Sequence, residues 1–269
     1  MTFDLEFFNI GYLDTLSYRN SFVHRLDPRI KIIVSLIFIL FVVSFPKYEI
    51  SSLLPFFFYP VFLLTAGNIP LKAIAKKIFF ISPFAVFIGI FNPLFDTGTM
   101  YTIFGVPVSG GWLSFLSILI KYMLTVSTAL LLIAVTSFPG ICEGLERLKL
   151  PKIFVIQLLF LYRYLFVLLE ESLRMMRARD ARSFGNRGKE IRTFVRLISV
   201  LLIRSIERAE MIFRAMLARG FRGEIKVLRR HTVNAADVLF LMISFTMFYI
   251  FRSYHVVNIM GAAFSTVLR

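Results

Sequence analysis

Long apolar runs separated by shorter polar segments account for most of the chain. A membrane span needs about 20 apolar residues, and about 17 to 25 are tolerated. Five stretches come close to this length: 30–45, 50–66, 78–95, 112–138 and 236–251. The second and third carry two prolines each: Pro55 with Pro60, and Pro83 with Pro93. We therefore expect these two helices to be kinked and to lie in a bundle, where neighbouring helices satisfy the freed backbone carbonyls.

The first stretch has a clear helix start. Asp27 suits the N-cap position, and Pro28 follows at the first helical position, where a missing N–H is tolerated. Pro46 ends the apolar run. Because the run is short, we expect Lys31 to extend its ammonium group toward the membrane surface.

Two further helical patterns lie between the fourth and fifth stretches, at 152–182 and at about 191–219. In the second, arginines interrupt apolar positions at three- and four-residue spacing. Segment 153–169 is apolar enough to be mistaken for a sixth span, but Arg163 lies inside it. We expect both helices to be amphipathic and cytoplasmic, with 153–169 resting against the membrane or the other helices. The alternative is that 153–169 crosses the membrane.

The composition supports a membrane protein. Hydrophobic residues make up 58% of the 269 residues and Phe occurs 32 times, with a mean hydropathy of +0.77, well above the values of soluble domains. The 31 Lys and Arg residues against 16 Asp and Glu residues give a net charge of +15. The chain is too apolar for a soluble nucleic-acid binder, so we expect a lipid bilayer and no nucleic acid as its partner. The single cysteine, Cys142, excludes an intramolecular disulfide, and we expect no cleavable signal peptide.

Basic residues alternate between the connections. They precede the first stretch and follow the second, whereas 92–111 contains none. The segment 143–230 holds 20 basic residues and nine acidic ones. The positive-inside rule therefore predicts that the N-terminus, the 67–77 connection and 143–230 are cytoplasmic and that the C-terminus lies outside.

An eight-residue pattern, Arg-Ala-x-x-Ala-Arg-(Ser/Gly)-Phe, occurs twice, at 177–184 and at 214–221. Both copies end a helical pattern where small residues flank an arginine. Such an arginine offers a planar, permanently charged donor on a surface that another protein can approach closely. We interpret the copies as docking surfaces for a protein partner. The alternative is two ordinary basic helix ends that interact with the helix dipole.

The offset between the two copies is 37 residues. Along an unbroken helix this separates the two arginines by at most about 55 Å, so they cannot serve one small site. Two equivalent surfaces indicate two equivalent receptors, such as the halves of a dimeric cytoplasmic partner.

Several motifs are shared with a known family: HRLDPRIK at 24–31, NPLFD at 92–96, TS at 136–137, LERLKLP at 145–151, RYL at 163–165, and the paired signatures Ala181-Arg182-Ser183 and Ala218-Arg219-Gly220. Over about residues 12–250 the chain resembles the transmembrane T component of energy-coupling factor transporters, in its CbiQ-like branch. The paired signatures are the specific part, because Leu-Asp-Pro-Arg alone fits any capped helix.

The resemblance implies a scaffold and not an enzyme, without a cofactor of its own. In such proteins, the signature arginines lie on coupling helices that insert into grooves of two ATP-binding-cassette ATPase subunits. The membrane helices hold a separate substrate-binding subunit. Carried over, Arg182 and Arg219 are the coupling arginines. Their neighbours Ala181, Ser183, Ala218 and Gly220 are expected to be small so that the helix ends fit the grooves.

The expected fold is therefore an all-α integral membrane protein with about five transmembrane helices and two or three long cytoplasmic coupling helices. Its expected segments are a cytoplasmic N-terminal segment, 1–29, a four-helix transmembrane part, 30–138, a cytoplasmic coupling-helix region, 139–232, and a final transmembrane helix with an extracytoplasmic C-terminus, 233–269. The resemblance implies a multi-pass location in a prokaryotic cell (inner) membrane.

Cobalt ion is the first choice of substrate, because 92–96 and the segment around Trp112 are most similar to the cobalt branch. The substrate-binding partner is then expected to be CbiM-like. Nickel or a vitamin stays open, since the choice of substrate would reside in that subunit.

Other candidate sites are weaker. His24, His231 and His255 share no helical spacing, so we expect no metal site. Lys121 lies off-centre within 112–138, and a structural role is the favoured interpretation. No glycine-rich loop resembles a phosphate-binding loop, so we expect partner subunits to hydrolyse ATP.

Two alternative classes are a membrane-embedded lipid-modifying enzyme, whose basic region would bind anionic headgroups, and a permease with its own substrate path. The enzyme would need acidic or histidine residues within the spans, which hold essentially no ionisable residue besides Lys121. The permease would need polar residues within the bundle, where the polar residues are mostly Ser, Thr and Asn.

Overall fold

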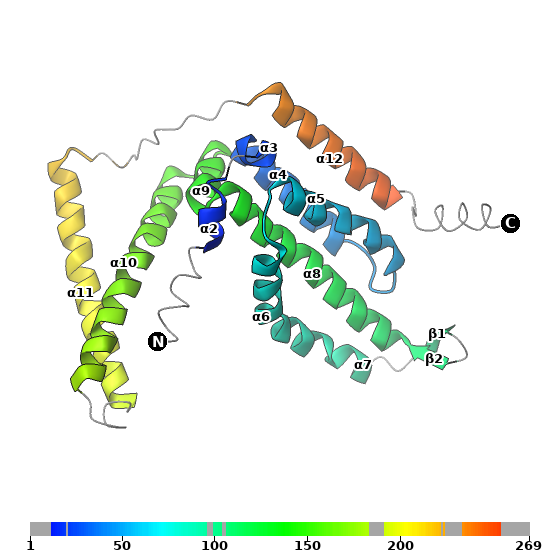
Figure 1. Ribbon diagram of the computed structural model, residues 1–269, viewed down its shortest axis with the longest axis horizontal. Coiled ribbons are helices and arrows are strands. Elements are labelled where there is room, and N and C mark those ends of the chain that lie inside the picture. Colours follow the sequence, from blue (N-terminus) through cyan, green and yellow to red (C-terminus); the bar gives the residue numbers. More distant parts are fainter. Residues whose placement is uncertain are drawn as a thin grey trace. The chain divides into compact units, whose positions relative to one another are not determined.

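The computed structural model describes residues 12–19, 21–95, 99–103, 106–182, 191–221, 223 and 233–253 (Figure 1). These residues divide into two compact units. The bundle unit is the described part of 12–144 together with 233–253, and the helix-pair unit is the described part of 145–230. Each unit is described by itself below.

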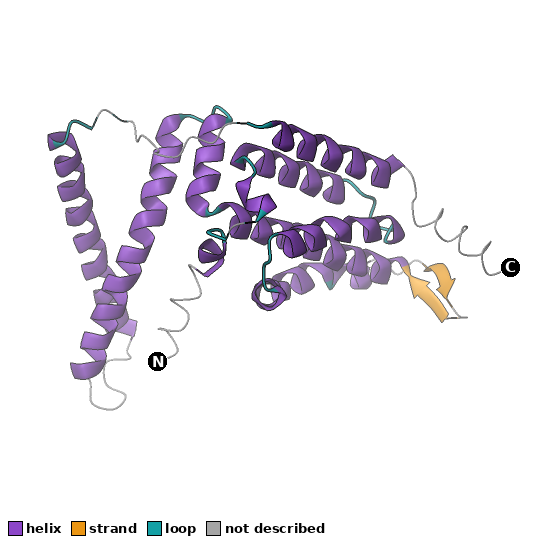
Figure 2. Cartoon of the chain, turned by 45° about the horizontal axis from the view of Figure 1, so that its top comes forward, coloured by secondary structure: helices purple, strands orange, loops and turns teal. Residues whose placement is uncertain are grey.

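The described part of the bundle unit consists of helices and one short β-hairpin (Figure 2). Its elements in chain order are α2 (Tyr12–Leu16), α3 (Phe22–Arg25), α4 (Pro28–Val43), η1 (Ser51–Phe57), α5 (Phe58–Ala66), α6 (Leu71–Gly89), α7 (Phe91–Phe95), β1 (Thr99–Ile103), β2 (Val106–Ser109), α8 (Gly110–Thr136), α9 (Phe138–Arg147), which ends just past the division, and α12 (Ala235–Ser253).

The expected all-α class is confirmed, with the hairpin as an addition that the sequence patterns did not predict. Strands β1 and β2 pair antiparallel, with Thr99 opposite Ser109 and Ile103 opposite Val106. The two strands are rich in Thr, Ile and Val, and these β-branched residues favour extended backbone.

Helix α8 is at the centre of the bundle unit, where it packs against α2, α4, α5, α6 and α7. Its buried face consists largely of small residues: Gly110, Gly111, Ser114, Ser117, Ser127, Thr128 and Ala134. Small residues let neighbouring helix backbones approach closely, which is how membrane helices gain packing energy. The hydroxyls of Ser127 and Thr128 donate to the Leu124 carbonyl at 3.0 and 2.9 Å, so their burial leaves no donor unsatisfied.

An aromatic cluster joins α4 to η1, α5 and α12. The Phe38 ring centroid lies 4.8 Å from that of Tyr59 and 5.3 Å from that of Phe248. Tyr59 and Phe248 meet edge to face at 5.2 Å, and Phe56 lies 5.9 Å from Phe38. Each such pair contributes about 0.5–1.5 kcal/mol beyond the apolar area that it buries. These rings therefore hold α12 against α4.

Four helical segments are long and apolar enough to cross a membrane: Leu71–Pro93, Gly110–Thr136, Lys152–Arg182 and Ala235–Ser253. Three of them overlap predicted stretches. The first predicted stretch became α4, whose 16 residues span about 24 Å, less than the hydrocarbon core of about 30 Å. By length and composition, α10 (Lys152–Arg182), the helix that contains 153–169, could also cross a membrane. The count of five crossings and the cytoplasmic assignment of 153–169 therefore stay predictions.

Each of the two proline-bearing stretches, which we expected to be kinked, is divided between two helical elements. In the second stretch, Pro55 lies in the 3-10 helix η1, which passes into α5 at Phe58. In the third, Pro83 lies inside α6, and Ile90 separates α6 from α7. A change from 3-10 to α geometry redirects the chain because the two forms have different hydrogen-bond spacing.

The structure places Asp27 at the N-cap of α4 and Pro28 at the first helical position, where the sequence indicates them. The Asp27 carboxylate accepts a hydrogen bond from the backbone N–H of Arg29 at 2.9 Å. Asp27 is 1% exposed, so this bond satisfies a donor that water cannot reach.

A second buried carboxylate, that of Asp237, joins the N-termini of two helices. One oxygen accepts from the backbone N–H of Asp27 at 2.8 Å, and the other accepts from the backbone N–H of Asn234 at 2.8 Å. Asn234 immediately precedes α12, so Asp237 closes a capping box on its own helix. The same side chain therefore fixes the start of α12 to the start of α4.

Lys31 completes this cluster, which we call the α4 cluster (Asp27, Lys31 and Asp237). The expectation that Lys31 reaches the membrane surface is wrong, because it is 5% exposed. Its ammonium group donates to the carbonyls of His24 at 3.4 Å and Val135 at 3.3 Å. The two carboxylates of the cluster attract its charge and so offset part of the cost of burying it.

Replacing Asp237 tests the importance of the α4 cluster. Asp237→Ala leaves two helix-terminal N–H groups without their acceptor, so we expect the free energy of unfolding in detergent micelles to fall by about 2 kcal/mol or more. Asp237→Asn keeps one acceptor oxygen and should lose less. Glu49→Ala, at an exposed carboxylate, is the control. Equal unfolding midpoints for Asp237→Ala and this control would contradict the assignment.

Candidate coupling interface

Helices α10 (Lys152–Arg182) and α11 (Ile191–Ala218) form the helix-pair unit, and their bounds match the predicted ranges. The two helices run antiparallel and diverge toward the end where α11 stops (Figures 1 and 2). An ion pair between Arg204 and Glu171, with a nitrogen–oxygen distance of 2.6 Å, links them. Arg204 is largely exposed, so this pair contributes less than about 1 kcal/mol and mainly sets the register of the two helices.

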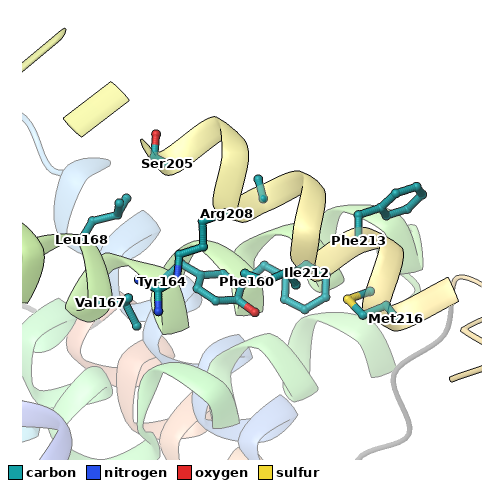
Figure 3. Close-up of a pocket in the computed structure, with 10 residues that line it drawn as sticks. Phe160, Tyr164, Val167, Leu168, Ser205, Arg208, Ile212, Phe213 and Met216 are labelled. Carbon is teal, nitrogen blue, oxygen red and sulfur yellow. The ribbon is translucent and has the colours of Figure 1, made fainter. Parts of the chain in front are cut away.

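An apolar groove of about 340 Å³ lies between the two helices. Phe160 and Tyr164 of α10 face it from one side, and Arg208, Ile212 and Met216 of α11 line the other (Figure 3). The groove means that the two helices do not close fully against each other. Their facing side chains remain accessible to a further binding partner.

The two signature arginines lie at the C-terminal ends of the two helices. Arg182 is the last residue of α10, and Arg219 directly follows α11. Both are exposed, as are Ala181 and Ala218 beside them. Within the described residues, neither guanidinium has a hydrogen-bond or ion-pair partner. Ser183 lies outside the described residues. Both charges are therefore available to a partner, and both also stabilise the helix dipole, as the alternative interpretation requires.

The second signature ends α11 in a Schellman cap. The Gly220 N–H donates to the Leu217 carbonyl at 2.9 Å, and the Phe221 N–H donates to the Met216 carbonyl at 3.0 Å. Gly220 has a φ of 77°, a conformation that costs about 1–2 kcal/mol for a residue with a Cβ. No atom lies within 4 Å of the position that its Cβ would take. Backbone conformation is thus a reason for glycine here, besides the expected fit to a partner's groove.

The separation of the two arginines follows from the geometry of α11. Its 28 residues run without a break and span about 42 Å. Because the helices are antiparallel, Arg182 and Arg219 lie at opposite ends of the pair. This agrees with the upper bound of about 55 Å from the sequence offset. A single small site cannot contain both.

Helix α11 carries a large exposed apolar surface and has no buried residue among those described. At least half of the surface of each of these side chains is exposed: Ile191, Phe194, Val195, Leu202, Ile203, Ile206, Met211, Phe213 and Leu217. Monomeric soluble proteins rarely leave a continuous surface of this kind uncovered. The helix pair is therefore suited to binding another protein or lipid.

His24 already uses both of its ring nitrogens. Nε2 lies 3.2 Å from the Leu16 carbonyl, which can only accept, so Nε2 carries the proton and Nδ1 accepts from the Ser21 hydroxyl at 2.7 Å. Burial, together with the nearby Lys31 charge, lowers the pKa of His24 and keeps the ring neutral. His231 and His255 lie outside the described residues. Among the residues described, no three His, Cys, Asp or Glu side chains are arranged to hold a metal ion.

Lys121 has the structural role that the sequence favoured. Its ammonium group donates to the Phe45 carbonyl at 2.6 Å, just beyond the C-terminal end of α4. Arg252 of α12 donates to the neighbouring Ser44 carbonyl at 3.4 Å and lies 4.3 Å from the centre of the Phe45 ring. Two cations therefore satisfy the carbonyls at the negative end of the α4 dipole.

Asp237 is the residue that the sequence patterns missed. It lies within the predicted stretch 236–251, which was taken to hold essentially no ionisable group, so that inference needs correction. A local signal was present, because Asn234 and Asp237 have the spacing of a capping box before an apolar run. The second contact of Asp237, to Asp27, joins residues 210 positions apart and leaves no local signal.

Comparison with known proteins decides the family. The family model CbiQ, described as cobalt transport protein, matches residues 19–228. The chain belongs to the CbiQ family. The expected resemblance to the energy-coupling factor T component is confirmed, and the chain is a multi-pass membrane subunit with an energy-coupling role in transport.

Three individual relatives illustrate the sequence similarity of this CbiQ-family chain. It is 30% identical over 223 residues to the energy-coupling factor transporter transmembrane protein EcfT of Bacillus selenitireducens, covering 76% of this chain and 81% of the relative. It is 28% identical over 235 residues to an uncharacterized protein of Methanocaldococcus jannaschii, covering 84% and 80%. It is 30% identical over 110 residues to the cobalt transport protein CbiQ of Rhodobacter capsulatus, covering 40% and 45%.

The cap at Gly220 can be tested separately from function. Gly220→Ala should destabilise the end of α11 by about 1–2 kcal/mol, because the Cβ of alanine makes the left-handed backbone conformation unfavourable. Faster hydrogen exchange of the residue 220 and Phe221 amides would report this loss. Gly220→Asn should lose less, since asparagine tolerates this conformation. Wild-type exchange rates in the alanine variant would contradict the explanation.

Proposed function

We propose that this CbiQ-family chain relays movements of two ATP-binding-cassette ATPase subunits to a separate substrate-binding membrane subunit. Arg182 and Arg219 are the contacts to the ATPases, one to each subunit. The observation that carries the proposal is the placement of these two exposed arginines, without partners among the described residues, at opposite ends of one helix pair. The relay requires the pair to be cytoplasmic, with the N-terminus on the same side.

The chemistry of the contact follows from the guanidinium group. A planar guanidinium between small residues can enter a groove and form two parallel hydrogen bonds to a carboxylate. We therefore expect each ATPase groove to present an acidic side chain to its arginine. The exposed apolar residues of α11 would supply the burial that such a contact needs around its charged centre.

The mechanical part of the relay depends on the stiffness of the helices. Helix α11 has 28 residues in continuous α-helical hydrogen bonding, so it cannot lengthen when two grooves some 42 Å apart change their separation. The pair must tilt or rotate instead. A groove between α10 and α11 gives the helices room to change their angle, while the Arg204–Glu171 ion pair holds one point of contact.

Cobalt ion is the proposed substrate, and a CbiM-like protein is the proposed substrate-binding subunit. Support comes from the description of the matching family as cobalt transport protein and from the name of the Rhodobacter capsulatus relative. The EcfT relatives carry names without a substrate, so nickel or a vitamin is the alternative. In either case, the substrate would be chosen by the partner subunit.

Charge reversal at the two arginines tests the ATPase contacts. The double variant Arg182→Glu/Arg219→Glu should lose copurification with the ATPase subunits. Removing one partner of a buried charge pair costs about 2–5 kcal/mol, and an introduced carboxylate adds repulsion. Affinity-tagged chain is purified from its native membrane in mild detergent, and the bound ATPases are quantified by mass spectrometry. Each single variant should retain part of the binding.

The control is Arg192→Glu/Arg196→Glu, which makes the same charge change on exposed residues of α11 outside the signatures. It should keep ATPase binding close to wild type. An equal loss of ATPase binding in both double variants would mean that the change in net charge, and not the signature arginines, weakens the binding. Full binding and ATP-driven transport by the signature variant would rule out the proposed relay.

Substrate identity is tested with the complex that the tagged wild-type chain brings down. After reconstitution into liposomes, radioactive cobalt should accumulate only with ATP on the ATPase side, and the signature double variant should abolish this accumulation. Unlabelled cobalt should compete more strongly than nickel. Preferential transport of nickel or of a vitamin would reject cobalt and leave the coupling role intact.

A further inference from the structure

A second apolar groove, of about 390 Å³, lies in the bundle unit between α5 and α12. Phe58 and Phe62 line one side, and Leu239, Ile243 and Met247 line the other. The lining residues with a side-chain hydroxyl, Tyr59 and Ser244, are both buried, so the accessible surface of the groove is almost entirely hydrocarbon. The hydroxyl of Tyr59 is 3.4 Å from that of Ser35, within hydrogen-bond distance. A ligand in this groove would make apolar contacts along its length and few hydrogen bonds.

The dimensions of the groove fit one leaflet of a membrane. On α12 the lining runs from Ala236 to Met247, a rise of about 16 Å. Half of a hydrocarbon core is about 15 Å thick. Because α12 is long and apolar enough to cross a membrane, lipid tails are the molecules that surround this groove.

One end of the groove lies beside a basic residue. Phe22 of α3 and Ala236 near the start of α12 both line the groove, and Arg25 is the last residue of the four-residue helix that Phe22 begins. Arg25 also lies two residues before Asp27, whose N–H is bonded to Asp237 next to Ala236. Two residues span at most about 7 Å, so the Arg25 backbone is held close to the groove's end.

Arg25 is the arginine at this end whose charge is not used within the described structure. Arg19 donates to the Asn68 carbonyl, and Arg29 lies 3.8 Å from the Asp27 carboxylate. The Arg25 side chain is exposed, and it has no hydrogen-bond or ion-pair partner among the described residues. A phosphate group matches the fork of donors that a free guanidinium presents.

We propose that this groove binds an anionic phospholipid, with one hydrocarbon chain between α5 and α12 and the phosphate on Arg25. The inference is independent of the proposed coupling function. A lipid in this position contacts α12 along the face that also carries Ser244 and packs beside the α4 cluster. It therefore stabilises the attachment of α12 to the rest of the bundle unit.

The test is native mass spectrometry of the purified full chain in detergent, titrated with dioleoyl phosphatidylglycerol. Dioleoylglycerol, which has the tails without the phosphate, should bind at least about tenfold more weakly. Glycerol phosphate, which has the phosphate without the tails, should show no binding in the same range. Arg25→Gln should weaken binding of the phospholipid at least about tenfold and leave dioleoylglycerol unchanged. Lys72→Gln, which removes one exposed charge elsewhere, should have no effect.

A matched pair of substitutions on α12 tests the groove. Ile243 and Met242 are 59% and 58% exposed, but only Ile243 lines the groove. Ile243→Trp should fill the groove and abolish specific phospholipid binding, whereas Met242→Trp should not. Unchanged binding in Arg25→Gln, or equal effects of the two tryptophan variants, would overturn the proposal.

Other occupants are separated by photo-cross-linking. A photoreactive residue at position 239 in the purified native complex should label phospholipid. Labelling of another membrane subunit, or of a second copy of this chain, would overturn the proposal by assigning the groove to that protein.

Discussion

Buried backbone N–H groups impose the main constraint on this bundle. Lipid offers them no acceptor, so each helix start must be satisfied from within the protein. Asp237 meets this need for two helices at once, because its two oxygens accept from the backbone N–H groups of the residues that immediately precede α4 and α12. Asp27 and Asp237 carry buried negative charges, and the positive charge of Lys31 offsets part of the cost of burying them. The Lys31 ammonium group also donates hydrogen bonds to the carbonyls of His24 and Val135. The relative positions of α3, α4, α8 and α12 follow from this group of contacts.

The opposite end of α4 is built by the same rule with opposite charges. Lys121 and Arg252 bind the carbonyls of Phe45 and Ser44, so α8 and α12 contact α4 at both of its ends. Between these ends, the rings of Phe38, Tyr59 and Phe248 fill the interior. Charged groups therefore fix the register of the helices, and aromatic packing supplies much of the energy. Polar contacts therefore hold both ends of the 16-residue helix α4.

Local signals explain which parts of the structure the sequence could predict. The N-cap at Asp27, the 3-10 helix at Pro55, and the limits of α10 and α11 all depend on neighbouring residues. The buried position of Lys31 and the second contact of Asp237 depend on residues about 100 and 210 positions away, and periodicity carries no record of them. The signature arginines could be identified by their repeat, whereas their placement at opposite ends of an antiparallel pair required the structure.

The two units differ in how they use their charged residues. In the bundle unit, Asp27, Lys31 and Asp237 are buried and bonded to backbone groups, so their charges stabilise the fold. In the helix-pair unit, the residues of α11 are all at least partly exposed, and Arg182 and Arg219 contribute no bond among the described residues. Charges that form no bond within the described chain remain available to add energy to a complex with another protein. A subunit that transmits force needs both kinds of part. In the relay proposed above, the bundle unit would keep its geometry under load, and the helix-pair unit would gain stability from the partner that moves it.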